Sequence, residues 1–471
     1  MKLNNTEVQR VDYSIDEIGT IYFYKDKVLR AITKESLSWV NELLDSGLID
    51  ELVSKKLFPK TLKTDYLIEG YSLIIEHEKL SNWNHSYEWS FDMLKDISIA
   101  VIEINEISNK YGYELIDCHA SNLIFHYNKP IYIDLGSFRK TDDVTVWSAK
   151  NIFLASYYVP LKLYSMGYIN IAQNITLSPN YFSLAEFKKI EHPVVAGFIG
   201  LNNIKKIQYI QDKIYSILLS SEDKIRKKLR HKNIIYLRIA LGIKKYLKCL
   251  SFNTEKAQLL IDKLNIYEEK SIWGDYQDCV IPKDSLRFNR ILEIVNSLEG
   301  AESAIEFAGN QGKLSCYLLK NSKINSVIAT DYDKNAVNKM YLSNKTTDNF
   351  LPLLINFVNP EGRAFDKKLV ERIGADVSIA LAVTHHLLLT QNYDLDYIFE
   401  MMSKFTNKYI LIEFMPLGLY GGDLKTTPKV PDYYNLGWFK KHFLKHYDYI
   451  LDEEIALNRH LFVGKIKEQL K

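Results

Sequence analysis

The sequence predicts an α/β protein whose carboxy-terminal domain, residues 270–471, is built on a mostly parallel sheet. Three observations favour this fold class. After Ser303, apolar runs of strand length alternate with segments of helical periodicity. A glycine-containing turn links the first of these runs to the helix that follows it. Before residue 270 the pattern differs, because short strand-like runs precede the helices, as in an α+β domain with a helical extension.

The chain is expected to contain two or three domains, because its 471 residues exceed what one hydrophobic core usually organises. The pattern changes place the boundaries at residues 1–140, 141–269 and 270–471. No proline-rich or glycine-rich linker marks these borders.

The first region mixes strands and helices. In order, it contains strand-like runs at Thr20–Tyr24 and Val28–Ile32, an amphipathic helix over Glu35–Ser46, a longer helix over Ser90–Lys110, and two short runs around Leu123–Phe125 and Ile131–Ile133. The last two runs predict a hairpin. The second region is mostly helical in pattern, and we interpret its basic segment Lys224–Lys232 as a solvated helix face.

The third region contains five strand-length runs, at Ala304–Phe307, Ser326–Thr330, Leu351–Ile355, Asp376–Val383 and Lys408–Glu413. Their alternation with helices predicts a parallel sheet that is covered on both faces. Two final runs, Tyr447–Leu451 and His460–Gly464, lie close together in sequence and predict a closing antiparallel hairpin. These runs together predict a sheet of seven strands.

Composition excludes several classes of partner. Lysine and arginine number 60 against 58 aspartate and glutamate residues, so no overall charge draws the protein to nucleic acid or anionic lipid. The four cysteines are scattered, which favours free thiols in a reducing compartment. No stretch approaches the roughly 18 apolar residues of a spanning helix. We therefore expect a cytoplasmic protein with no stable membrane insertion and no nucleic-acid partner, and the sequence holds no signal of oligomeric state.

The turn after the first strand of the carboxy-terminal domain reads Glu306-Phe-Ala-Gly-Asn-Gln-Gly312. Small residues in such a turn let backbone N–H groups approach a ligand closely. The second predicted strand leads to Asp331, whose carboxylate can accept hydrogen bonds from both hydroxyls of a ribose. The turn and the spaced carboxylate together indicate a nucleoside site.

This turn departs from the Gly-x-Gly-x-x-Gly of dinucleotide-binding enzymes and resembles the first motif of class I S-adenosylmethionine-dependent methyltransferases, which have a Rossmann-like fold. The resemblance implies that S-adenosylmethionine is the cofactor. It also implies cofactor-binding roles for Glu306, Ala308, Gly309, Gly312, Asp331, Tyr332 and Asn356. Ala308 and Asn310 stand where the family often has glycine.

Three further segments, residues 353–363, 375–389 and 409–416, resemble a bacterial subgroup that includes host-specific nodulation and surface-polysaccharide methyltransferases. The resemblance implies a glycan or another small molecule as the methyl acceptor. Segments at 57–61 and 87–96 extend the same likeness into the amino-terminal part of the chain.

Candidate catalytic residues follow the fourth and fifth strands, at the edge where an α/β sheet presents its chemistry. Methyl transfer to a hydroxyl requires removal of the hydroxyl proton, and His385 or His386 could accept it. Glu413 could orient the imidazole or bind the acceptor hydroxyl. No residue cluster requires a metal for this reaction.

The amino-terminal region carries a second motif, Asp117-Cys-His-Ala-Ser-Asn122, followed after a strand-like run by Asp134-Leu-Gly136. This spacing resembles the catalytic loop and the metal-binding aspartate of kinases. The resemblance implies that Asp117 is the base and that Asn122 and Asp134 bind Mg²⁺ against the phosphates of ATP.

The phosphate-gripping elements of a kinase are much less evident. Only Gly19 precedes the first strand of the lobe, and Arg30 occupies the place where lysine is expected. An active kinase and a degenerate kinase-like domain are therefore both open interpretations, and Mg-ATP is a cofactor only if the domain is active.

Three functions compete on the sequence alone. The first is O-methylation of a glycan or glycolipid precursor by a methyltransferase that carries a degenerate kinase-like domain. The second is a bifunctional kinase and methyltransferase. The third is a non-catalytic binding scaffold made of two degenerate domains. The sequence favours the first of these.

Overall fold

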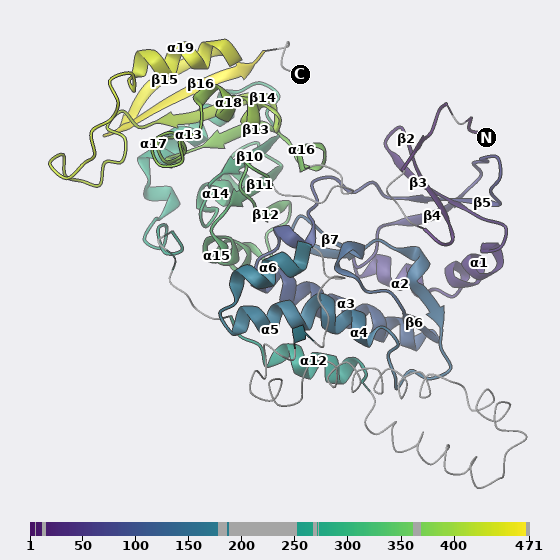
Figure 1. Ribbon diagram of the computed structural model, residues 1–471. Helices are drawn as coiled ribbons and strands as arrows, with labels where there is room; N and C mark the ends of the chain where they lie inside the picture. The colour runs from purple at the N-terminus through teal and green to yellow at the C-terminus, as the bar shows by residue number, and fades with distance from the viewer. Residues whose placement is uncertain are drawn as a thin grey trace, which may run out of the picture.

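The computed structural model describes residues 1–4, 6–11, 16–177, 186–187, 252–266, 271, 273–360 and 369–467. The described chain forms an amino-terminal half, which ends at residue 266, and a carboxy-terminal domain, which begins at residue 271 (Figure 1). Each part has its own large sheet, of five and seven strands. The basic segment 224–232 lies outside the described residues.

The amino-terminal half begins with an antiparallel sheet in the order β1-β2-β3-β5-β4. Its strands are β1 (Gln9–Arg10), β2 (Gly19–Tyr24), β3 (Lys27–Ile32), β4 (Thr61–Thr64) and β5 (Leu73–His77). Two short helices, α1 (Leu37–Asp45) and α2 (Leu48–Ser54), lie between β3 and β4 in the chain. The predicted strands and amphipathic helix of this region are confirmed.

The rest of this half is organised around α3 (Phe91–Lys110), whose apolar side chains face a continuous core. After it come two small antiparallel pairs: β6 (Tyr113–Leu115) with β9 (Phe138–Lys140), and β7 (Leu123–His126) with β8 (Lys129–Tyr132). The predicted helix and hairpin are thus both present. The described helices that follow are α4 (Lys150–Phe153), α5 (Val159–Ser165), α6 (Ile169–Leu177) and α12 (Thr254–Asp262).

The carboxy-terminal sheet has the order β12-β11-β10-β13-β14-β16-β15. Its strands are β10 (Ser303–Phe307), β11 (Ser326–Asp331), β12 (Phe350–Leu354), β13 (Ala375–Ala380), β14 (Thr406–Phe414), β15 (Tyr447–Ala456) and β16 (Arg459–Ile466). The first five run parallel, and β16 joins β14 antiparallel. The seven strands and the closing hairpin are as the sequence predicts, although β13 is three residues shorter than expected at its carboxyl end.

Helices alternate with these strands, as the apolar pattern predicts. They are α13 (Leu286–Ser297), α14 (Lys313–Asn321), α15 (Lys334–Asn344), α16 (Leu369–Arg372), α17 (Thr384–Leu389), α18 (Leu395–Ser403) and α19 (Leu436–His446). The parallel strands are buried along most of their length because helices cover both faces of the sheet. The strand order reverses at β10, between β11 and β13, which is where ligands bind in sheets of this kind.

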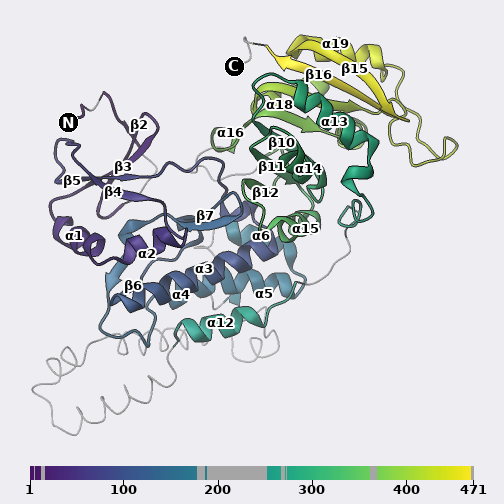
Figure 2. The ribbon, with the colours of Figure 1, turned by 180° about the vertical axis from the view of Figure 1, so that it is seen from behind.

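The two halves pack closely, with α15 of the carboxy-terminal domain against α3 of the amino-terminal half (Figures 1 and 2). Asn338 exchanges hydrogen bonds with the backbone and side chain of Asp92, and the Tyr341 hydroxyl donates to Asp96. A fully buried ion pair joins Arg372 to Glu88 at 2.5 Å. The contact also has an apolar part, because one hydrophobic core runs through both halves.

Among the described helices, none combines the length and the apolar composition that crossing a lipid bilayer requires.

Candidate functional site

The turn after β10 has an unusual backbone. Ala308 and Asn310 both have positive φ angles, of 51° and 55°, which side-chain-bearing residues rarely adopt. A Cβ on Gly309 would lie 2.9 Å from the Glu306 carboxyl carbon, so the close approach of the chain here requires glycine. Gly312, at φ 68°, caps the start of α14. The turn therefore folds tightly over the end of β10, as a ligand-cradling turn must.

Glu306 lies at the base of this turn and is almost fully buried. Its carboxylate accepts hydrogen bonds from the backbone N–H of Ser315 at 3.1 Å and from the Ser315 hydroxyl at 2.6 Å. Burial nevertheless dominates and raises the pKa of Glu306 to about 7. A buried acid of this kind favours a nearby positive charge.

Asp331 ends the neighbouring strand β11 and faces the same turn. Its two oxygens accept hydrogen bonds at 2.8 Å from the backbone N–H groups of Asn310 and Asp333. Burial raises the pKa of Asp331 to about 6 despite these bonds. The next residue, Tyr332, is 56% exposed, so its ring lies at the mouth of the site.

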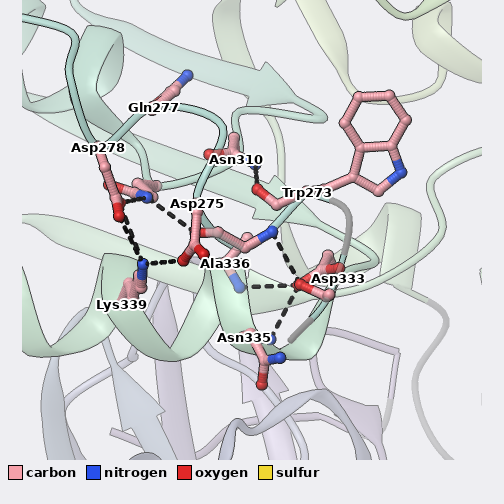
Figure 3. A network of polar contacts seen from close by, with 12 residues as sticks. Trp273, Asp275, Gln277, Asp278, Asn310, Asp333, Asn335, Ala336 and Lys339 are labelled. Carbon is pink, nitrogen blue, oxygen red and sulfur yellow. Dashed lines mark hydrogen bonds and ion pairs between the residues drawn. The ribbon is translucent and has the colours of Figure 1, made fainter. Parts of the chain in front are cut away.

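A segment before α13 crosses the turn and was not foreseen from the sequence (Figure 3). Asn310 donates to the carbonyl of Trp273 at 2.7 Å, and Gln311 donates to the carbonyl of Gly274 at 2.9 Å. The Ser271 hydroxyl donates to Asp333 at 3.0 Å. The only sequence signal was a cluster of aromatic and polar residues at 273–278, which has no strand or helix periodicity.

These elements enclose a cavity of about 650 Å³. Glu306, Ala308, Asn310, Asp331, Tyr332 and Asn356 line one part of it, and His385, His386, Met415, Leu419, Tyr420 and Arg459 line another. Trp273 and Tyr276 belong to the same wall. The predicted cofactor residues and the predicted catalytic histidines therefore share one cavity, apart from Gly309 and Gly312, which shape the turn behind it.

The two histidines sit at the start of α17, and their rings lie 4.1 Å apart. Burial, together with the charges of His386 and Arg459, lowers the pKa of His385 to about 3, and its Nδ1 has no hydrogen-bond partner among the residues that the structure describes. Burial also lowers the pKa of His386, whose ring packs edge-on against Trp273. Both imidazoles are neutral at pH 7 and able to accept a hydrogen bond or a proton.

Glu413 has a different environment from the one expected. Its fully buried carboxylate forms a bidentate pair with Arg287, at 2.6 Å for both bonds, and accepts a further bond from Arg459 at 3.1 Å. It also accepts the backbone N–H of Ala382 at 2.9 Å. No contact with either histidine is among these bonds, so its role in orienting an imidazole stays a prediction that this geometry does not favour.

In the amino-terminal half, the predicted loop residues do come together. The Oδ1 of Asp117 lies 2.5 Å from Nδ1 of His119 and also accepts the His119 backbone N–H. Burial alone would raise the pKa of Asp117, but hydrogen bonds from His119 and Asn122 outweigh burial and lower it. Asp117 and Asn122 thus lie side by side, as a catalytic loop requires.

Asp134 is engaged by side chains of the protein itself. Gly136 N–H and the Ser137 hydroxyl donate to it, and Nη1 of Arg30 lies 3.4 Å away. Arg30 on β3 also pairs with Asp16 at 2.8 Å, and both side chains are about 5% exposed. No group of three metal-ligating side chains occurs in the described part of the chain. The guanidinium of Arg30 therefore contacts Asp134, at the position where the resemblance to kinases implies a lysine.

The sequence matches no protein-family model. Nodulation protein NoeA from Rhizobium meliloti (strain 1021) is 24% identical over 420 residues, which cover 85% of this chain and 83% of NoeA. N-methyltransferase NodS from Bradyrhizobium japonicum WM9, solved with S-adenosyl-L-homocysteine, aligns with a TM-score of 0.32 and 10% identity over 41% of this chain and 91% of that one. PH0226 protein from Pyrococcus horikoshii OT3 aligns with a TM-score of 0.31 and 14% identity, over 41% of this chain and 99% of that one.

Likenesses with TM-scores near 0.3 carry no weight for function. The match to NoeA is of another kind, because a similarity that covers 85% of the chain has to include both halves. The sequence similarity to NoeA therefore extends over both the amino-terminal half and the carboxy-terminal domain of this chain.

Proposed function

We propose that the carboxy-terminal domain binds S-adenosylmethionine and transfers its methyl group to an acceptor. The observation that carries this proposal is the cavity at the β10–β13 switch point, where a tight turn and two buried carboxylates, Glu306 and Asp331, meet. When bound, S-adenosylmethionine supplies an electrophilic methyl group on a positively charged sulfur. Asp331 would hold the ribose hydroxyls, and Asn356 and Tyr332 would lie beside the adenine.

The acceptor we propose is a hydroxyl of a glycan or glycolipid precursor, as the sequence resemblance implies. His385 and His386 line the same cavity as the proposed cofactor residues, so an acceptor bound in it could lie beside them. Of the two, His386 is the better base, because burial and a nearby arginine hold the pKa of His385 at about 3. His386 would take the hydroxyl proton while the cavity walls hold the acceptor in line.

For the amino-terminal half we propose a degenerate kinase-like domain. The strand order, the long helix α3 and the adjacent Asp117 and Asn122 support the likeness to kinases. The Arg30 contacts disfavour the bifunctional alternative, because they pair both Asp134 and Asp16 with a fixed positive charge. The cytoplasmic location and the absence of a nucleic-acid substrate stay predictions.

Calorimetric titration of the full-length protein with S-adenosylmethionine tests the methyltransferase proposal. Micromolar binding with one site per chain is expected. A parallel titration with Mg-ATP separates the alternatives, because a protein that binds neither S-adenosylmethionine nor Mg-ATP would be a non-catalytic scaffold instead.

A further inference from the structure

The wall of the cavity carries more positive charge than its buried partner neutralises. Two guanidinium groups, Arg287 and Arg459, contact the single carboxylate of Glu413. Arg287 uses Nε and Nη2 for that carboxylate, whereas Arg459 uses only Nη1. Among the described residues, no hydrogen-bond acceptor is recorded for Nε or Nη2 of Arg459. Both arginines line the cavity.

The two arginines lie close together, because both contact the same Oε2 of Glu413. Arg459 lines one cavity with His385 and His386, and Glu306 and Asp331 line that cavity too. The cavity therefore combines buried carboxylates, the proposed base His386 and a guanidinium that is only partly engaged by Glu413.

Arg459 is also held in place. It begins β16, directly after Asn458, which has a positive φ of 57° in the turn from β15. The Asn458 carboxamide accepts the backbone N–H of Leu417 at 2.6 Å, which ties this turn to the loop that follows β14. That loop supplies Leu419 and Tyr420 to the cavity wall. The arginine thus lies on a braced turn, with a side chain only about one-fifth exposed.

We propose that Arg459 recognises an anionic group on the methyl acceptor, a carboxylate or a phosphate monoester. This inference rests on the proposed function and names the substrate class of the same site. A guanidinium with free N–H groups in a partly buried wall forms strong, oriented hydrogen bonds to such oxygens. A neutral acceptor would leave Nε and Nη2 of Arg459 partly desolvated with only neutral groups to bind, which is less favourable than an anionic acceptor.

The test uses the full-length protein with and without S-adenosylhomocysteine. Acetate and methyl phosphate are titrated as anionic probes, with acetamide as the neutral match, into wild type, Arg459→Gln and Arg459→Lys. Arg290→Gln is the matched control, because Arg290 lies on α13 in a surface pair with Glu453 and does not line the cavity. Thermal unfolding of each variant is recorded first, and Arg459→Lys supplies the readout if Arg459→Gln unfolds.

We expect wild type to bind an anionic probe at least about tenfold more tightly than acetamide. Arg459→Gln should lose this preference, Arg459→Lys should keep part of it, and Arg290→Gln should keep all of it. S-adenosylhomocysteine affinity should stay unchanged in every variant.

Equal binding of acetate and acetamide by wild type, or an undiminished preference in Arg459→Gln, would overturn the proposal. So would a loss of S-adenosylhomocysteine affinity in Arg459→Gln with anion binding intact, because the arginine would then hold the carboxylate of the cofactor. Failure of wild type to bind S-adenosylhomocysteine is a separate result that contradicts the proposed function itself.

Discussion

At the scale of single residues, the turn after β10 holds two residues with side chains in a backbone conformation that favours glycine. Ala308 and Asn310 stand where glycine is common, and both are held at positive φ. The sequence alone indicated the substitutions but not their cost, because a φ angle depends on the fold around it. In the structure the turn keeps its shape although two of its residues, which carry side chains, are strained at positive φ.

Replacing Ala308 by glycine should therefore stabilise the protein, by about 0.4 to 1 kcal/mol, because the positive φ is free of strain only for glycine. Urea unfolding measures the change. The matched control is Ala304→Gly on β10, which should destabilise the protein because Ala304 is buried in a regular strand. A lower stability for Ala308→Gly would mean that the turn is not strained.

Glu306 predicts a pH dependence of the ligand-free protein. Its pKa is about 7 in the folded state and 4.5 as an ordinary glutamate, so the folded state binds more protons between these values. The contribution of Glu306 to the free energy of unfolding therefore falls as pH rises from about 4.5 to 7.

The stability of wild type, measured by urea unfolding from pH 4.5 to 7.5, should contain this decline, and Glu306→Gln should remove it. Asp331 should add a similar decline that ends near its pKa of about 6. Identical pH profiles for wild type and Glu306→Gln would contradict the claim that burial raises the pKa of Glu306.

At the scale of elements, hydrophobic periodicity predicted most of the helices and strands. All seven strands of the carboxy-terminal sheet and the long helix α3 lie within a few residues of their expected ranges. Periodicity cannot predict contacts between segments far apart in the sequence, because it shows only which face of a single helix or strand is apolar. Thus the crossing segment at 273–278 and the pairing of Glu413 with Arg287 were not predicted.

The contact between α3 and α15 likewise joins segments far apart in the sequence, so the sequence did not predict it. Near it, Glu88 and Arg372 form an ion pair in which both side chains are 1% exposed. Because Glu88 belongs to the amino-terminal half and Arg372 to the carboxy-terminal domain, this pair couples the folding of the two.

Glu88→Gln should lower the free energy of unfolding by about 3 to 5 kcal/mol, because it removes one charge of a fully buried ion pair. Hydrogen exchange should report faster opening in both halves. Glu103→Gln is the control, since its pair with Lys55 is exposed and worth about 0 to 1 kcal/mol. Faster exchange confined to one half would show that the halves fold independently.

At the scale of the whole molecule, two domains with one shared core hold a cavity of about 650 Å³ at the sheet switch point. The amino-terminal half brings Asp117 and Asn122 together and pairs Asp134 and Asp16 with Arg30. If the proposal of a degenerate kinase-like domain holds, we expect this half to support the carboxy-terminal domain mechanically, through the α3 and α15 contact.

ATP at up to millimolar concentration should accordingly not raise the melting temperature of the full-length protein in a thermal-shift series. This should hold both with and without Mg²⁺. Arg30 and Asp16 would have to separate before phosphates could enter. A large, metal-dependent rise in melting temperature at micromolar ATP would restore the bifunctional interpretation.

The central claim is that Asp331, facing the turn after β10, holds the ribose of S-adenosylmethionine. Calorimetric titration of the full-length Asp331→Ala variant tests it most directly, with Asp348→Asn on the exposed surface as the control. We predict a loss of about 1.5 to 3 kcal/mol, more than tenfold in affinity, for Asp331→Ala alone. Wild-type affinity in a folded Asp331→Ala variant would contradict it.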